Sequence, residues 1–156
     1  MNDSETSAKL AALGIPLSNE ELISPAPVIV RKRVAFGDCD PAGVVYTPRF
    51  ADYLVMAHSW LKEIILPPLP FDLPMRGITI DFQSMLRVGD RFDMRCEIEE
   101  IRSRTFDIVI RATTLDGQPT FSGKLTPIAY DRARRSALPL PDEVRQRLLE
   151  YREACR

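Results

Sequence analysis

The second half of the chain alternates apolar and polar residues in four successive segments, and this pattern most constrains the fold. In the clearest segment, Phe92, Met94, Cys96 and Ile98 are separated by charged residues. Such alternation is typical of a β-strand with one buried face. The four segments are 78–83, 91–98, 106–113 and 120–130. Because turn signals such as Asp116-Gly117 separate them, the pattern predicts a run of antiparallel strands.

A long amphipathic helix is predicted before these strands. Thr47 is expected as its N-cap and Pro48 at its first position, where the missing N–H costs nothing. A proline cluster at 67–70 ends it. The apolar residues on one helical face are Phe50, Leu54, Ala57, Leu61 and Ile64. With a β-branched strand at 28–36, the order predicts an α+β fold in which one face of a five-stranded antiparallel sheet packs on the long helix.

Length and composition place the protein among globular, single-domain chains. The 156 residues are 45% apolar and 28% charged. We expect the domain to cover residues 27–133, after an N-terminal extension at 1–26 that begins with a short helix through Leu13. A C-terminal tail at 134–156 is expected to carry a short helix from Asp142.

Charge and hydropathy exclude several partners. The formal net charge is −1, so no global basic field attracts nucleic acid. No apolar run approaches the roughly 20 residues that span a bilayer, and the N-terminus lacks the pattern of a secretory signal. We therefore expect a cytoplasmic protein with no nucleic-acid and no membrane partner.

The segment 37–46 joins the first strand to the helix and carries two carboxylates, Asp38 and Asp40. A helix N-terminus offers unpaired N–H groups that can hold the developing oxyanion of an ester or thioester. A nearby carboxylate can attack the carbonyl or deprotonate water. We expect Asp38 to cap a turn instead. Neither the three cysteines nor the single His58 forms a metal motif, so no metal and no cofactor are expected.

The stretch Phe36-Gly-Asp-Cys-Asp-Pro-Ala-Gly-Val-Val-Tyr46 resembles the signature loop of the 4-hydroxybenzoyl-CoA thioesterase family, in particular its Pseudomonas-type branch. The resemblance runs from about Val30 to Tyr130. It implies a hot-dog fold, in which the five-stranded antiparallel sheet wraps around one long central helix, and an acyl-CoA thioesterase that releases a free acid and coenzyme A. It also implies a homo-oligomer, a dimer or a tetramer, with active sites between subunits.

By the same resemblance, Asp40 is the catalytic nucleophile or general base. The backbone N–H of Thr47 polarises the thioester carbonyl. Gly43 and Val44 let the thioester approach closely, and Tyr46 is a candidate for lining the acyl pocket, although an aromatic residue before a helix also serves as a hydrophobic staple.

Three further positions concern the substrate. Arg102 and Arg104 match the basic side chains that grip the nucleotide of coenzyme A in this family, and guanidinium groups suit phosphates. Val55 falls where 4-hydroxybenzoyl-CoA hydrolases carry a carboxylate for the substrate hydroxyl. Because valine cannot accept that hydrogen bond, we expect an unsubstituted aromatic or a short or medium aliphatic acyl group.

Other functions stay open at the level of sequence. An acyl-carrier-protein thioesterase would need a basic docking surface, for which Arg132, Arg134 and Arg135 are candidates. A non-catalytic acyl-binding module would gain nothing from a negative charge at Asp40. Hot-dog dehydratases and hydratases use a histidine with a carboxylate, and His58 lies well away from Asp40 in the sequence.

Overall fold

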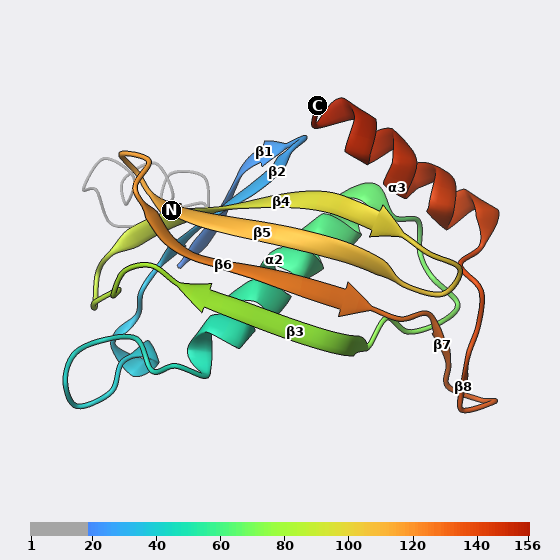
Figure 1. The fold of residues 1–156 in the computed structure, drawn as a ribbon. Helices are drawn as coiled ribbons and strands as arrows, with labels where there is room; N and C mark the ends of the chain where they lie inside the picture. Colours follow the sequence, from blue (N-terminus) through green and yellow to red (C-terminus); the bar gives the residue numbers. More distant parts are fainter. Residues whose placement is uncertain (1–18) are drawn as a thin grey trace, which may run out of the picture.

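Helix α2 (Arg49–Ile65) lies against one face of a large antiparallel sheet, as Figure 1 shows. The computed structural model describes residues 19–156. Phe50, Leu54, Ala57 and Leu61 are all buried, as their helical spacing predicts. The α+β class and the hot-dog arrangement, a sheet curved around a central helix, are thereby confirmed.

The sheet has six strands in the order β1-β2-β4-β5-β6-β3, so the predicted count of five is wrong. The additional strand is β1, which pairs with β2 and falls within the residues expected to form the N-terminal extension. Its sequence, EELISP, has the charges and the proline typical of an edge strand and no clear apolar alternation. The short helix expected before Leu13 lies outside the described residues. The strands are β1 (Glu20–Pro25), β2 (Val28–Arg33), β3 (Met75–Phe82), β4 (Arg91–Ile101), β5 (Phe106–Thr114) and β6 (Pro119–Pro127).

The close approach of α2 to the sheet depends on a residue without a side chain. A Cβ at Gly123 of β6 would lie 2.4 Å from Cδ1 of Leu54 and 3.1 Å from the carbonyl oxygen of Thr79. Leu54 is fully buried, so it has no free space into which to withdraw. Gly123 therefore sets the distance between α2 and the sheet.

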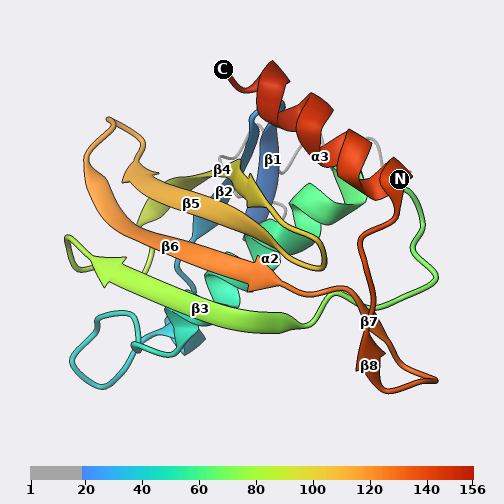
Figure 2. The same ribbon diagram turned by 45° about the vertical axis from the view of Figure 1, so that its right-hand side comes forward.

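A second helix, α3 (Asp142–Ala154), packs beside β4 and is the helix predicted from Asp142 in the C-terminal tail. It follows a small hairpin of β7 (Tyr130–Asp131) and β8 (Ser136–Ala137), visible in Figure 2. The Tyr151 hydroxyl donates to the Cys96 carbonyl at 2.6 Å and accepts the Val28 N–H at 2.7 Å, which ties α3 to both β2 and β4. Among the described residues, neither α2 nor α3 combines the length and the apolar character needed to cross a bilayer.

Strand β3 forms one edge of the sheet, and α2 covers it incompletely. Ile78 and Phe82 share the sheet face of the buried core residues, yet 40% and 52% of their surfaces are exposed. Only β6 pairs with β3 among the described strands, so one row of backbone groups has no strand partner there. This edge combines exposed apolar side chains with unpaired backbone.

His58 is buried in α2 although its side chain is ionisable. Its Nε2 atom has no hydrogen-bond partner among the described residues. Burial, followed by the nearby charge of Lys62, lowers the pKa of His58 from 6.5 to about 4. The folded protein thus holds a neutral imidazole at neutral pH.

Below pH 6.5 the unfolded chain binds a proton at His58 that the folded chain excludes, so stability falls as the pH drops from 6.5 toward 4. We predict that His58→Gln removes this dependence. Between pH 7 and pH 4.5, the wild type should lose about 2 kcal/mol more unfolding free energy than the variant. Urea denaturation of both proteins at the two pH values measures the difference. Equal losses would show that the pKa of His58 is the same in the folded and the unfolded protein.

Candidate active site

The loop between β2 and α2 wraps around the carboxylate of Asp40. Its Oδ1 atom accepts the N–H of Ala42 at 2.9 Å and, more weakly, that of Val44 at 3.5 Å. Gly43 has a φ of 77°, a conformation that glycine adopts without strain, and it closes this turn by donating to the Asp40 carbonyl. The Oδ2 atom accepts no hydrogen bond from a described residue. The loop therefore fixes the carboxylate through one oxygen and leaves the other available.

Thr47 supplies an unused backbone donor in the same loop. The N–H groups of residues 42–46 are all bonded within the protein, and those of residues 49–51 bond to the carbonyls three residues before them. Among the non-proline residues from 42 to 51, Thr47 is the one whose N–H donates to no described residue. The helix itself begins one residue later than expected, because Pro48 and not Thr47 is the N-cap. This shift leaves the Thr47 N–H ahead of the first turn.

Asp38 is held by its own partners. Its Oδ2 atom accepts the Tyr53 hydroxyl at 2.8 Å and the Ala35 N–H at 3.0 Å, and Arg49 Nε lies 3.7 Å from Oδ1. Burial and the bond to Asp38 raise the pKa of Tyr53. Asp38 thus caps the turn, as predicted. The sequence pattern did not reveal Tyr53 as its partner, although Tyr53 lies next to Leu54 on the buried face of α2.

Exposed apolar side chains gather at this end of the molecule. The loop between β3 and β4 pairs with the Asp40 loop, because the Val45 N–H donates to the Leu86 carbonyl at 2.9 Å and Val44 bridges to Arg87. These two loops and the end of β3 carry the residues Phe36, Tyr46, Phe82, Met85 and Val88, all of them exposed. A cluster of exposed apolar side chains of this kind marks a binding or contact surface.

Val55 lies on α2 about two turns from Thr47 and is 37% exposed. Asp52, the nearest carboxylate on the helix, pairs with Arg49 at 3.0 Å. The carboxylate of Asp52 is therefore already paired with Arg49 at the protein surface.

Arg102 and Arg104 lie in the β4–β5 turn, at the opposite end of the sheet from the Asp40 loop, as Figures 1 and 2 both show. The two η nitrogens of Arg102 donate to the carboxylate of Asp107 at 3.0 and 2.7 Å. The Arg102 hydrogen bond is the main reason that the pKa of Asp107, a buried residue, falls to about 2. The side chain of Arg104 is exposed. One chain by itself does not bring either arginine to Asp40.

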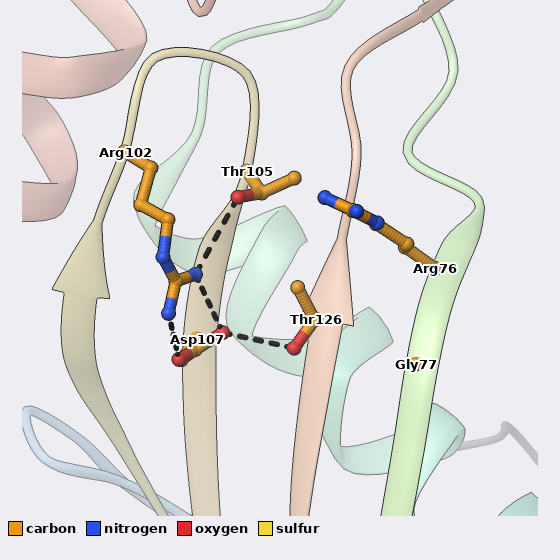
Figure 3. A pocket seen from close by; sticks show the side chains of 6 residues that line it. All are labelled: Arg76, Gly77, Arg102, Thr105, Asp107 and Thr126. Carbon is orange, nitrogen blue, oxygen red and sulfur yellow. Dashed lines mark hydrogen bonds and ion pairs between the residues drawn. The ribbon is translucent and has the colours of Figure 1, made fainter.

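A pocket of about 300 Å³ opens beside Arg102 on the sheet face away from α2 (Figure 3). It lies where the β4–β5 turn meets the start of β3. Its lining residues are Arg76, Gly77, Arg102, Thr105, Asp107 and Thr126. Neither Arg76 nor Asp107 could be recognised from the sequence as a pocket residue, because a lone charge at the start of a strand is common.

Comparisons with known proteins identify the family of the chain. The family model of the thioesterase-like superfamily matches residues 34–148. A 1,4-dihydroxy-2-naphthoyl-CoA hydrolase of Prochlorococcus marinus subsp. pastoris is 25% identical over 132 residues, which cover 75% of this chain and 85% of the relative.

Two solved structures have a similar fold. A 1,4-dihydroxy-2-naphthoyl-CoA thioesterase from Synechocystis has a TM-score of 0.70 at 23% identity and covers 78% of this chain and 95% of its own. A gentisyl-coenzyme A thioesterase has a TM-score of 0.69 at 25% identity, covering 77% of this chain and 98% of its own.

The family match spans more than half of the sequence and includes the Asp40 loop, α2 and the strands that follow. The chain therefore belongs to the thioesterase-like superfamily. It is a thioester hydrolase.

Proposed function

We propose that this protein hydrolyses acyl-CoA thioesters with Asp40 as its catalytic carboxylate and the Thr47 N–H as its oxyanion donor. One observation carries the proposal. The loop before α2 leaves one oxygen of Asp40 without a partner among the described residues, and the Thr47 N–H is the one unbonded backbone donor among the non-proline residues from 42 to 51. A preorganised acid–base group beside a preorganised donor is what acyl transfer requires.

Two reaction courses use this arrangement. In the first, the free oxygen of Asp40 attacks the thioester carbon and expels the thiolate of coenzyme A, and water then hydrolyses the resulting anhydride. In the second, Asp40 takes a proton from a water molecule that attacks the same carbon, and the C–S bond then breaks to release the thiolate of coenzyme A. In both, negative charge develops on the carbonyl oxygen, and the Thr47 N–H stabilises it. The N–H groups of Ala42 and Val44 hold the carboxylate in place, and Gly43 closes the turn by donating to the Asp40 carbonyl.

The acyl group is proposed to be aromatic. The relatives named for a substrate act on 1,4-dihydroxy-2-naphthoyl-CoA and gentisyl-CoA. Tyr46 and Val55 are both partly exposed and supply apolar surface on either side of the helix start. The loop motif favours the Pseudomonas-type branch of the 4-hydroxybenzoyl-CoA thioesterases, although Val55 offers no acceptor for a ring hydroxyl.

The active unit is proposed to be a dimer joined through β3. Antiparallel pairing of two β3 edges about a two-fold axis satisfies the unpaired backbone and covers Ile78 and Phe82. Strand β3 spans roughly 23 Å from Met75 to Phe82. Its last residue, Phe82, contacts Phe50 at the start of α2, with ring centroids 4.9 Å apart. Antiparallel pairing therefore places the Asp40 end of one subunit beside the start of β3 in its partner.

Transfer from an acyl carrier protein is less favoured. The basic hairpin between β7 and β8 would be its docking surface, but Arg132 pairs with Asp72 at 2.9 Å and Arg134 with Asp131 at 3.8 Å. These pairs offset much of the positive charge that an acidic carrier would recognise.

We predict that Asp40→Asn lowers kcat by about 10²–10⁴-fold and leaves the fold intact, because the amide can neither attack nor accept a proton. Asp38→Asn is the matched control: it also removes one carboxylate from the loop, and we expect a milder loss. Steady-state hydrolysis of benzoyl-CoA with both variants measures the two effects. A loss below tenfold for Asp40→Asn, or a larger loss for Asp38→Asn, would reassign the catalytic carboxylate.

We also predict that the enzyme hydrolyses benzoyl-CoA and 4-hydroxybenzoyl-CoA with similar kcat/KM, because the side chain of Val55 cannot bind the hydroxyl. A panel of aromatic, short-chain and medium-chain acyl-CoAs tests this expectation. In Val55→Glu, selectivity for the hydroxylated ring should rise. Strong selectivity already present in the wild type would place a different polar group at the ring.

A further inference from the structure

The pocket at the start of β3 contains an arginine that the proposed reaction does not use. Arg76 projects into it from β3, facing Arg102 and Thr105 across the opening (Figure 3). Its side chain forms no hydrogen bond or ion pair with a described residue. Arg76 is thus a cation without a counter-charge in a concave site.

A backbone irregularity directs Arg76 to this place. Met75 pairs with Pro127 and Gly77 with Thr126, so Arg76 is the extra residue of a β-bulge. Bulges re-aim side chains at the ends and edges of sheets. The next residue, Gly77, adds no side chain to the pocket lining, and a Cβ there would lie 4.0 Å from the Cβ of Thr126, an ordinary contact distance.

Arg102 is less suited than Arg76 to hold an added anion. It is committed to the buried Asp107, and it also pairs with Glu100 and contacts Thr105 Oγ1 at 3.5 Å. Thr126 and Lys124 donate to the same Asp107 carboxylate at 2.8 and 3.5 Å. The negative charge inside the pocket is therefore fully paired, and the uncompensated charge is that of Arg76.

We propose that Arg76 binds a phosphate group of the coenzyme A nucleotide, and that it serves the active site of the partner subunit. This rests on the proposed function and on the β3 dimer. Antiparallel pairing brings the first residues of β3, including Arg76 of the partner subunit, to the end of the molecule that carries Asp40. The acyl thioester then lies on one chain and the phosphates lie on the other.

Kinetics and direct binding test the phosphate contact separately. Arg76→Ala should raise KM for benzoyl-CoA by about tenfold or more with kcat nearly unchanged, since the contact is equal in ground and transition states. It should leave the kinetics of benzoyl-pantetheine, which lacks the nucleotide, unaltered. Arg76→Lys should restore part of the loss. Arg147→Ala on α3 is the matched control, because Arg147 is also exposed and forms no ion pair with a described residue.

Calorimetric titration measures the affinity for coenzyme A without any hydrolysis, so it tests the role of Arg76 separately from the proposed function. Weaker binding to Arg76→Ala than to wild type supports the inference even if no thioester is hydrolysed, an outcome that would refute the proposed function alone. Unchanged coenzyme A affinity and KM would overturn the inference while leaving the function intact. Dephospho-CoA identifies which phosphate is held: a mutant effect that disappears with it indicates the 3′-phosphate, and one that persists indicates the pyrophosphate.

Hybrid dimers test the placement across subunits. When Asp40→Asn and Arg76→Ala chains are refolded together in equal amounts, about one quarter of the sites should combine an intact Asp40 with an intact Arg76 of the partner subunit. These sites should show both the wild-type KM and the wild-type kcat. By themselves, Asp40→Asn has a low kcat and Arg76→Ala has a raised KM. If both residues acted in one chain, the mixture would contain no such site, and the absence of a wild-type KM phase would overturn the shared arrangement.

Discussion

The packing of α2 on the sheet is the constraint on which the rest of the structure depends. Leu54 rests on Gly123 at a distance that no larger residue would allow, and Phe50 packs against Phe82 and Phe121 at the same end. Burial of this stripe fixes where the helix begins. Because the helix begins beside the end of β3, the loop that precedes it is stretched across that end of the sheet.

The chemistry of the loop follows from this placement. The turn around Asp40 is closed by backbone donors, and the helix start uses its own carbonyls for the first N–H groups. The second carboxylate oxygen of Asp40 and the Thr47 N–H are among the groups left without a partner in the described part of the chain. Tyr53 and Arg49 extend the control to Asp38, since both come from the first two turns of α2 and hold that carboxylate in a structural role. The fold thereby separates a structural aspartate from a proposed catalytic one two residues away.

Local patterns predicted much of this arrangement, because the strands of the meander and the stripe of α2 each carry a clear period. The loop motif likewise singled out Asp40, Gly43, Val44 and Thr47 together. Strand β1 was not predicted, because this edge strand contains charged residues and a proline and lacks an alternation of apolar and polar residues. The role of Arg102 as the partner of Asp107 could not be foreseen, since it depends on contacts across the β4–β5 turn. Arg76 was missed because a bulge, and not a sequence motif, sets its direction.

The proposals share one premise, that a second chain completes the active site. Asp40 and the arginine-lined pocket lie at opposite ends of the same sheet, and β3 exposes apolar side chains between them. Light scattering coupled to size exclusion, with activity measured across the eluted peak at micromolar protein, tests this central claim most directly. Hydrolysis should coincide with a species of at least twice the 17.7 kDa of one chain. A 17.7 kDa species with full activity toward acyl-CoA would contradict it.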